Sequence, residues 1–398
     1  MSNGFDFDQE INRDGTSSTK YDGRYSMFGR GDVIPAWVAD MDFAAPPAVT
    51  QALMQRAAHP VYGYTMFPEG LYEALIVWIK HRHQWDIQRD WIVMCPGVVP
   101  SINAAIVALT QPGDGVIVQP PVYFPFFSTV TQASRCLIYN PLRIENQQNN
   151  RYTIDFGHLD QCAKNARFLL LCSPHNPVGR VWFPEELRRL LEIAEKYNLI
   201  IFSDEIHADL IYASSRHYPL ATLSNDTIKI ITAVAPSKTF NIPGLNLSAL
   251  IIPDKSIRNA VKDIFSNLHI NPTNPFSIVA FEAAYREGEE WLEALLVYLR
   301  DTRDAVQKIL YEHLPEIRVT PIEGTYLMWL DFRAWNMTDA QLKHFFVHQV
   351  GIGMSPGILF GAEGSGFMRL NIAAPRRVID GLLKRLLCFN KSESRIKR

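Results

Sequence analysis

The sequence lacks the features that mark several classes of protein. It has five cysteines in 398 residues, an odd number with no Cys-x-x-Cys pair. This argues against a disulfide framework or a zinc cluster and favours an intracellular protein with reduced thiols. No apolar run reaches the ~18 residues that a transmembrane helix needs. The acidic, polar N-terminus also lacks the basic start and apolar core of a secretory signal. We therefore expect a cytoplasmic protein that has no membrane span.

The sequence also lacks an excess of either charge. Its 39 Lys and Arg residues nearly balance 41 Asp and Glu residues, for a formal net charge of −2. This balance gives no electrostatic reason to expect nucleic acid or an anionic membrane as a partner. Hydrophobic residues make up 47% and charged residues 20%, as in an ordinary globular protein. At roughly 100–200 residues per domain, the length predicts two domains, or three.

Short apolar stretches alternate with helical patterns between residues 47 and 290. Apolar strands separated by helices predict a mostly parallel sheet that helices cover on both faces. The predicted strands are Trp91–Cys95, Gly115–Gln119, Phe168–Cys172, Leu199–Ser203, Ile228–Ala233 and Leu247–Ile252. The predicted helices are Ala48–Ala58, Gly70–His83, Pro100–Leu109 and Glu185–Tyr197. Residues 47–290 are therefore predicted to form a large α/β domain.

The pattern changes near residue 290. A long helix, about Glu289–Leu314, precedes strands at Tyr326–Asp331 and Gly366–Ile372, with a helix near Asp339–Val350 between them. This order predicts a second, smaller α+β domain over residues 291–398.

Lys238 lies in a turn that follows a predicted strand, Ala235-Pro-Ser-Lys-Thr-Phe-Asn-Ile-Pro-Gly-Leu245. A lone lysine is usually a surface charge. Burial at a strand end, however, disfavours the ammonium form and lowers the pKa. Because a neutral amine can form an imine with an aldehyde, Lys238 is a candidate nucleophile.

Asp204 stands at the end of another apolar strand, in Ile201-Phe-Ser-Asp-Glu-Ile-His207. Ligand crevices in parallel sheets open at the carboxyl ends of the strands. The aspartate can cap a helix. Alternatively, it can pair with a ring nitrogen of a ligand and keep that nitrogen protonated.

Two more strand ends carry candidate binding groups. In Leu171-Cys-Ser-Pro-His-Asn-Pro-Val-Gly179 the Asn-Pro pair favours a turn without any function, yet Asn176 could donate to a phenolic oxygen. In Cys95-Pro-Gly-Val-Val-Pro-Ser101, Gly97 permits close backbone approach. Free N–H groups at the start of the following helix would hold a phosphate.

Together these turns resemble the pyridoxal-phosphate enzymes of fold type I, the aspartate-aminotransferase superfamily, from residue 37 to residue 375. The sequence is most similar to the branch of cystathionine β-lyases and related C–S lyases. The motifs are Trp37-Val-Ala-Asp-Met-Asp-Phe43, Tyr62-Gly-Tyr-Thr65, Ser173-Pro-His-Asn-Pro177, Ser203-Asp-Glu-Ile-His207, Ser237-Lys-Thr-Phe-Asn241, Glu323-Gly-Thr-Tyr326 and Arg369-Leu-Asn-Ile-Ala-Ala-Pro375. The resemblance implies a large domain that binds pyridoxal 5′-phosphate, a small C-terminal domain, and an N-terminal arm, residues 1–46, that joins the small domain.

The resemblance also implies roles for individual residues. Lys238 would bind the cofactor as an imine and, once displaced by the substrate amine, would remove the Cα proton. Asp204 would pair with the ring nitrogen, so that the ring stays an electron sink. Asn176 would hydrogen-bond the ring hydroxyl, and Tyr123 would stack on the ring. His207 would pack against the ring, orient the aspartate, or serve a purely structural role.

The phosphate and the substrate would be bound by other motifs. Backbone N–H groups of Gly97 and Val98 would bind the phosphate, together with the hydroxyl of Ser237. Tyr64 would reach the phosphate of a neighbouring subunit, which implies a homodimer with shared active sites. Ala39, in the Trp37–Phe43 segment, would line the substrate mouth.

Arg369 would clamp the substrate α-carboxylate in a bidentate pair. The plain alternative is a surface salt bridge. In many aminotransferases of the superfamily, a serine three residues before the lysine and an arginine eight residues after it also bind the phosphate. Here those positions hold Ala235 and Asn246. This departure agrees with the lyase branch and leaves the phosphate to the other groups named above.

The implied reaction is α,β-elimination of L-cystathionine, or of other cysteine S-conjugates, to a thiol, pyruvate and ammonia. Tyr123 or Lys238 near the sulfur would favour this elimination. An aminotransferase is the alternative, and a regulatory role through protein binding could be added to either activity. We expect no metal, because the His81/His83 and His344/His348 pairs have no evident carboxylate or cysteine partner and should be exposed.

Overall fold

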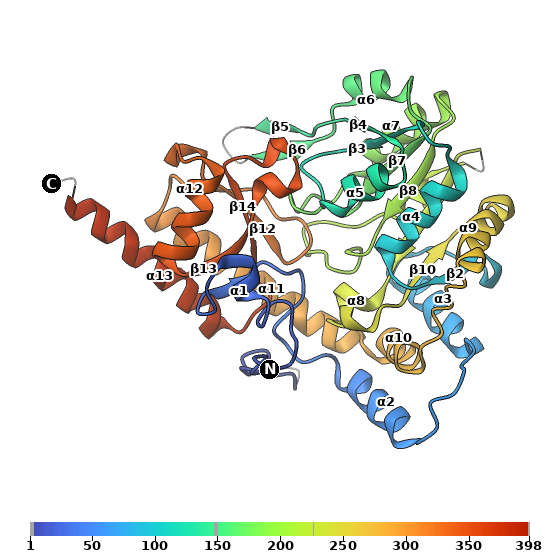
Figure 1. Cartoon of the computed structure of the whole chain (residues 1–398), viewed down its shortest axis with the longest axis horizontal. Helices are drawn as coiled ribbons and strands as arrows, with labels where there is room; N and C mark the ends of the chain where they lie inside the picture. The colour runs from blue at the N-terminus through green and yellow to red at the C-terminus, as the bar shows by residue number, and fades with distance from the viewer. Residues whose placement is uncertain (1–3, 147–149, 226, 397–398) are drawn as a thin grey trace.

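The computed structural model describes residues 4–146, 150–225 and 227–396 and contains a large and a small sheet (Figure 1). In spatial order the large sheet consists of β2 (Ile92–Cys95), β10 (Ser248–Ile251), β9 (Lys229–Val234), β8 (Ile200–Asp204), β7 (Phe168–Cys172), β3 (Gly115–Val118) and β4 (Cys136–Tyr139). Neighbours from β9 to β4 run parallel, whereas β10 is antiparallel to both β2 and β9. The mostly parallel sheet expected from the sequence is confirmed.

Helices cover both faces of the large sheet, as its apolar strands require. Successive side chains of a strand point to opposite faces: Val116 and Val118 of β3 face one buried cluster with α4, α5 and α9, and Ile117 faces another with α6 and α7. The helices of this part are α2 (Pro47–Ala58), α3 (Glu69–His83), α4 (Val98–Leu109), α5 (Pro125–Gln132), α6 (Phe156–Ala163), α7 (Pro184–Lys196), α8 (Pro236–Thr239), α9 (Lys255–Asn267) and α10 (Pro275–Glu287).

The small sheet includes a strand from the N-terminal region. Its order is β1 (Ile34–Ala36), β13 (Ile352–Pro356), β14 (Phe367–Asn371), β12 (Leu327–Asp331) and β11 (Arg318–Val319). The first pair, β1 with β13, is parallel, and the other pairs are antiparallel. Its helices are α11 (Glu289–His313), α12 (Asp339–His344) and α13 (Arg376–Ile396). The other α-helix and strands are α1 (Arg24–Phe28) and the hairpin of β5 (Arg143–Asn146) and β6 (Arg151–Thr153), and short 3₁₀ helices and one π-helix connect the main elements.

One predicted helix is divided in two. The pattern of residues 339–350 predicts a single α-helix, but α12 ends at His344 and a π-helix follows over Phe345–Val350. Phe345, Phe346 and Val347 are all buried. Three consecutive buried side chains span more than the single face that an α-helix presents to a core, and the wider turn accommodates them.

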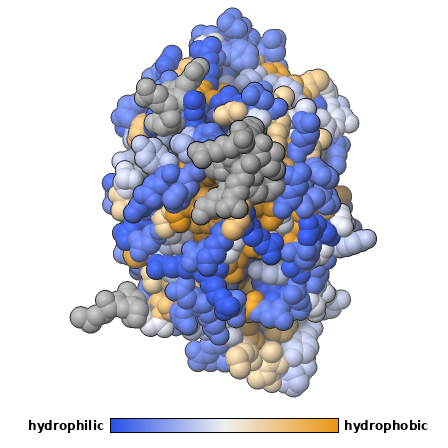
Figure 2. All heavy atoms as spheres, turned by 90° about the vertical axis from the view of Figure 1, so that its left-hand side faces the viewer, coloured by the Kyte–Doolittle hydropathy of each residue, from blue (hydrophilic) through white to orange (hydrophobic). Residues whose placement is uncertain are grey.

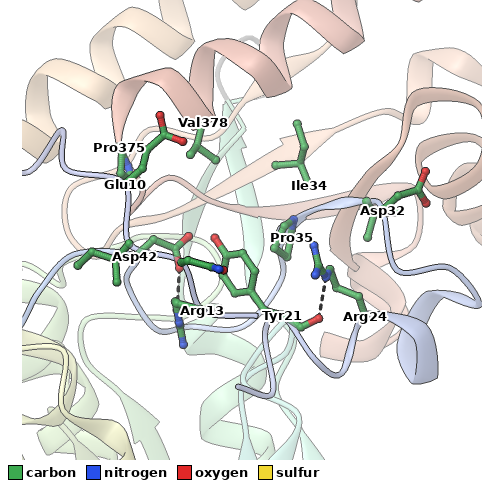
Figure 3. A pocket seen from close by; sticks show the side chains of 13 residues that line it. Glu10, Arg13, Tyr21, Arg24, Asp32, Ile34, Pro35, Asp42, Pro375 and Val378 are labelled. Atoms are coloured by element: carbon green, nitrogen blue, oxygen red, sulfur yellow. Dashed lines mark hydrogen bonds and ion pairs between the residues drawn. The ribbon is translucent and has the colours of Figure 1, made fainter. Parts of the chain in front are cut away.

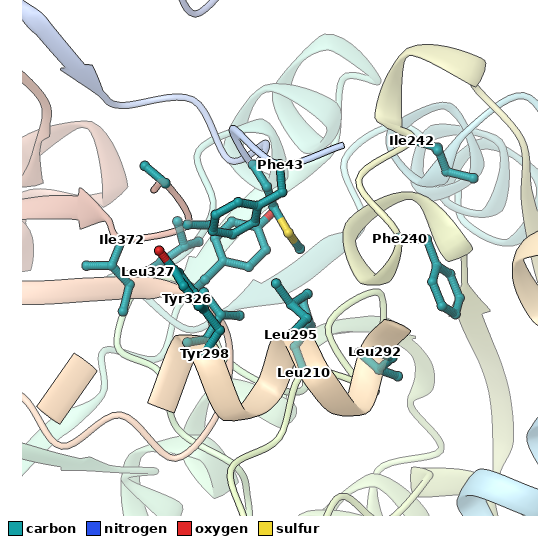
Figure 4. Close-up of a cluster of buried hydrophobic side chains, with 14 of the residues drawn as sticks. Phe43, Leu210, Phe240, Ile242, Leu292, Leu295, Tyr298, Tyr326, Leu327 and Ile372 are labelled. Carbon is teal, nitrogen blue, oxygen red and sulfur yellow. The ribbon is translucent and has the colours of Figure 1, made fainter. Parts of the chain in front are cut away.

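The largest buried cluster joins the two sheets (Figure 4). It contains Phe43 from the N-terminal region, Phe240 from the large part, Leu295 from α11 and Leu327 from β12. Because the core runs on between the two parts, the limits at residues 46 and 290 remain predictions.

Hydrophilic residues cover most of the face beside α12 and α13 (Figure 2). Within the described residues, no helix combines the length and the hydrophobicity that crossing a membrane requires.

Candidate active site

A cavity of about 420 Å³ opens where β7, β8 and β9 end. Its wall includes Cys172 and Asp204, the last residues of β7 and β8, and the turn after β9. The carboxyl ends of parallel strands meet at one edge of a sheet, so residues far apart in sequence converge there. Nine of the predicted site residues line this cavity: Ala39, Gly97, Val98, Tyr123, Asn176, Asp204, His207, Ser237 and Lys238.

Asp204 is a buried carboxyl group without an ion-pair partner among the described residues. Its Oδ1 accepts the N–H of Ile206 at 3.2 Å. Burial raises the pKa of Asp204 to about 7, although the N–H of Ile206 and the charge of Lys238 oppose that rise. A cationic ring nitrogen would supply the missing partner, so the sequence interpretation of this residue fits its surroundings.

Lys238 lies in the short helix α8 with its amine inside the cavity. Its Nζ donates to the carbonyl of Ala39 (2.7 Å), and the hydroxyl of Tyr326 donates to the same oxygen (2.9 Å). Burial, helped by the charge of Arg369, lowers the pKa of Lys238 to about 8. A buried amine that releases its proton this readily suits imine formation and proton transfer.

Arg369 lies in β14 and is buried beside the cavity. It donates to Asn176 Oδ1 (3.1 Å) and to the carbonyl of Trp37 (2.7 Å), both of which are uncharged acceptors. Its Nε is buried and has no hydrogen-bond partner among the residues that the structure describes. Burial lowers the pKa of Arg369 to about 10, so the guanidinium stays charged at neutral pH. The surface salt bridge considered from the sequence is wrong, because the side chain is buried and these acceptors are neutral.

His207 is buried, and its Nδ1 has no hydrogen-bond partner in the described part of the chain. Burial lowers the pKa of His207 to about 3, and the positive charges of Lys238 and Arg369 add to this effect. The imidazole is therefore neutral. Its ring lies edge-on to that of Tyr326, with the ring centres 6.3 Å apart.

Another part of the cavity lining provides backbone donors. Gly97 has a φ of +135°, which residues with a Cβ rarely adopt, and α4 begins at Val98. The first N–H groups of a helix have no intrahelical acceptor and bind anions. Ser237 adds a hydroxyl. Among the described lining residues, Lys238 is the only lysine or arginine.

Tyr64 lies outside this cavity. It is fully exposed and lines an outer pocket of about 540 Å³ with Tyr62, Gly244 and Asn246. Asn246 also lines the cavity that contains Lys238. In a single copy of the chain Tyr64 thus does not line the cavity. Its contact with the phosphate bound by a neighbouring subunit remains a prediction.

An ion cluster that sequence reasoning missed holds the segment 37–43 in place. Arg13 binds Asp40 (2.6 Å) and Asp42 (2.7 Å), and buried Lys20 also binds Asp42 (2.8 Å). Figure 3 shows Arg13 directed at Asp42 beside Tyr21. These ties fix the backbone that presents the Ala39 carbonyl to Lys238. These pairs were not predicted because their members lie 22–29 residues apart in sequence.

A second cluster lies behind the site and corrects one expectation. His83 is buried rather than exposed, and its Nε2 lies 2.8 Å from Asp209 Oδ1. The carboxylate of Asp209 also accepts from Trp78 (3.1 Å) and from Thr239 (2.8 Å), the residue after Lys238. The apolar α3 brings His83 inward because Trp78 and Ile79 face the core. His81, His344 and His348 are exposed, as expected.

A second carboxylate–imidazole pair lies next to the first. Glu205, the residue after Asp204, binds His217 at 2.8 Å, and the rings of His83 and His217 meet edge to face with centres 5.5 Å apart. No group of three His, Cys, Asp or Glu side chains in the described parts of the chain is arranged to hold a metal ion.

The cavity therefore fits the cofactor that the sequence resemblance implies. It offers a buried carboxyl to a ring nitrogen, an amine to an aldehyde and helix N–H groups to a phosphate. Residues 37–386 match the profile of the aminotransferase class I and II family. The chain belongs to this family. Within the family, it belongs to the branch of cystathionine β-lyases and C–S lyases.

Three family members illustrate the similarity. The chain is 38% identical to cystathionine beta-lyase PatB of Bacillus subtilis over 96% of its own length and 98% of that protein. Cystalysin from Treponema denticola, whose crystal structure contains pyridoxal 5′-phosphate, is 39% identical with a TM-score of 0.94, over 98% and 99% of the chains. The pyridoxal-phosphate-bound C–S lyase from Staphylococcus hominis is 31% identical with a TM-score of 0.88, over 96% and 98%. The similarity to cystalysin confirms the predicted fold class.

Proposed function

We propose that this protein is a carbon–sulfur β-lyase that cleaves the Cβ–S bond of L-cysteine thioethers. From L-cystathionine and water it would form homocysteine, pyruvate and ammonia. The observation that carries the proposal is the convergence of Lys238, Asp204 and Arg369 on one cavity. A base, a partner for a ring nitrogen and a partner for a carboxylate are the groups that this chemistry needs.

The cofactor is pyridoxal 5′-phosphate, which supplies an aldehyde for the amine and a ring that accepts the electrons of the Cα–H bond. Asp204 binds the ring nitrogen, and Asn176 binds the ring hydroxyl. The N–H groups of Gly97 and Val98 and the hydroxyl of Ser237 bind the phosphate.

Proton transfer falls to Lys238 and Tyr123. With its pKa lowered to about 8, Lys238 has far more of the neutral amine that takes the Cα proton near neutral pH than an ordinary lysine has. The Ala39 carbonyl holds Nζ in place. Burial raises the pKa of Tyr123, so its hydroxyl keeps a proton that it can donate to the leaving sulfur. Arg369 binds the α-carboxylate, for which its unpartnered Nε is available. Tyr123 and Lys238 both line the cavity, and a proton donor beside the leaving sulfur favours elimination over amino-group transfer.

A homodimer completes the proposal. Tyr64 belongs to an exposed segment that includes Val61, Tyr62 and Met66, and the nearby Met54 of α2 is exposed too. A group of exposed apolar side chains marks an interaction surface. A second copy would cover this surface and bring Tyr64 to the phosphate of its partner. A single-chain mass in sedimentation equilibrium of the holoenzyme would contradict the dimer.

The function is tested with purified holoenzyme and L-cystathionine in the absence of any keto acid. We expect pyruvate, measured with lactate dehydrogenase, together with an equal amount of free thiol. Lys238→Ala is the control and should form neither product. Turnover that requires an added keto acid and releases no thiol would instead identify an aminotransferase. A protein that contains no cofactor would favour a role in binding alone.

A further inference from the structure

The opening of the active-site cavity is lined by apolar side chains from three separate elements. Met27 comes from α1, Phe124 directly precedes α5, and Leu359 lies in the 3₁₀ helix Gly357–Phe360. Their exposed fractions are 38%, 46% and 46%, whereas Asp204 and Asn176 are buried. The exposed residues of the lining are these three, Pro100 and the uncharged Asn246, whereas the charged groups lie at the buried end.

The apolar wall is supported by further aromatic rings. Trp37 lines the cavity and meets Phe28 edge to face, with ring centres 5.6 Å apart. The ring of Phe124 lies 5.2 Å from Tyr123 and 6.3 Å from Phe360. These contacts hold large apolar surfaces at the entrance, where a single exposed leucine would mean little.

Charged side chains are confined to the buried end. Of the described residues that line the cavity, Asp204 and Lys238 are the only Asp, Glu, Lys or Arg. Arg369 adjoins this end through Asn176. All three have roles in the proposed reaction, which leaves no charged partner at the entrance. The exposed segment that a second copy would contribute, residues 61–66, reads Val-Tyr-Gly-Tyr-Thr-Met and also carries no charge.

The uncharged entrance should favour some thioether substrates over others. The amino and carboxylate groups on the cysteine side are bound at the buried end, so the substituent on sulfur extends towards the entrance. In L-cystathionine that substituent carries a second ammonium and a second carboxylate. Moving charges out of water without a partner is costly, whereas burying an apolar substituent is favourable.

We infer that the preferred substrates are L-cysteine thioethers whose sulfur carries an uncharged alkyl or aryl group, with L-cystathionine a poorer substrate. The inference rests on the proposed β-lyase function and names its substrate class. The products are then an apolar thiol, pyruvate and ammonia, with water consumed. Met27, Phe124 and Leu359 are the residues that determine this specificity.

The first measurement compares kcat/KM of the holoenzyme for S-benzyl-L-cysteine and for L-cystathionine. We expect at least about a tenfold preference for S-benzyl-L-cysteine, within the range by which an apolar pocket discriminates. Titration calorimetry with the two analogues in which a methylene replaces the sulfur should show the same order of affinity. Because these analogues have no C–S bond and share the same amino-acid end, the difference between their affinities reports on the entrance.

The second measurement places a charge at the entrance. Leu359→Lys supplies a partner for the distal carboxylate of L-cystathionine, and it should lower the preference for S-benzyl-L-cysteine about tenfold or more. Leu268→Lys is the matched control, because Leu268 is 63% exposed and lies outside the cavity. It should leave the preference unchanged. The Phe124→Ala variant, which adds no charge, should weaken binding of the benzyl analogue more than that of the charged one.

The outcomes distinguish the two proposals. A preference of the wild type for L-cystathionine, or an unchanged preference in Leu359→Lys, would overturn the inference while the β-lyase function stands. Absence of turnover with both thioethers, together with tighter binding of the benzyl analogue, would overturn the β-lyase function and keep the apolar entrance. Absence of turnover with both thioethers, together with equal affinity for the two analogues, would overturn the β-lyase function and the inference about its substrates.

Discussion

Two buried aspartates five residues apart have opposite surroundings. Asp204 accepts one backbone N–H and has no ion-pair partner among the described residues, and burial raises its pKa to about 7. Burial also acts to raise the pKa of Asp209. There, however, the hydrogen bonds and charge of His83 and the bond from Thr239 outweigh it, so the pKa lies below its usual value. The same residue type at similar burial is thus satisfied in one place and left unsatisfied in the other.

The difference in partners indicates that Asp204 belongs to a binding site, whereas Asp209 stabilises the structure around that site. A buried carboxylate that has its full set of partners stabilises the native structure, whereas one without partners costs stability until a ligand supplies them. Asp204 belongs to the cavity, together with Lys238 and Arg369. Asp209 belongs to the cluster behind it, where it holds Thr239 next to the lysine. Four predictions test this contrast.

The largest effect should follow from Lys238→Ala. The amine is the only nucleophile in our assignment, so its loss should abolish covalent attachment of the cofactor and lower kcat by at least about 10³-fold. Borohydride reduction followed by peptide mapping measures the attachment. Label retained on another side chain would refute the assignment of Lys238. Lys196→Ala, which changes an exposed lysine, controls for the loss of a positive charge.

Replacing each of the two aspartates with asparagine should change the stability of the protein in opposite directions. In cofactor-free protein, Asp204→Asn removes an unpaired buried carboxyl group and should raise Tm. Asp209→Asn leaves His83 without its carboxylate partner and should cost about 3 kcal/mol. Thermal unfolding of both variants measures the difference. If Asp204→Asn is as destabilising as Asp209→Asn, the contrast does not exist.

The pH dependence sharpens the same comparison. The folded pKa of Asp204, about 7, exceeds its ordinary value of 3.8, so the folded protein holds this proton more tightly than the unfolded chain does. The stability of cofactor-free protein should therefore fall as the pH rises from about 4 to 7. The Tm advantage of Asp204→Asn should be small near pH 4 and largest above pH 7. An advantage that is equal at all pH values would contradict the raised pKa.

The smallest effect concerns two buried threonines. Thr239→Val removes the hydroxyl that donates to Asp209 and should cost about 1–2 kcal/mol. Thr232→Val should cost almost nothing, because the buried Thr232 hydroxyl has no hydrogen-bond partner within the described residues. Urea unfolding measures both variants, and Thr239→Ser should recover most of the loss. Equal costs at both positions would mean that the bond to Asp209 does not matter.

Local patterns predicted the strands that carry the site. β7, β8 and β9 are fully or almost fully buried apolar runs, and such runs are visible in a sequence. The sequence pattern did not predict strands such as β4, Cys136–Tyr139, because their side chains are half-buried or exposed. The strand β1 was not predicted for another reason: its three residues become a strand only by pairing with β13, more than 300 residues away.

The sequence likewise predicted only part of the candidate site. Residue types and strand-end positions pointed to Lys238, Asp204 and Asn176. The contacts that define their state join distant parts of the chain. Lys238 meets a carbonyl 199 positions away, and Arg369 meets Asn176 across 193 positions. Likewise, the apolar entrance gathers side chains from α1, from the residue before α5 and from the 3₁₀ helix Gly357–Phe360, and their convergence has no local signature.

By itself, the amino-acid sequence determined where the main strands form and which chemical groups stand at their ends, because burial and chain turns depend on neighbouring residues. Only the tertiary structure decided which of those groups find a partner. Desolvation and hydrogen bonding arise where distant segments pack, and they shift the pKa values of Lys238, the two aspartates and His207.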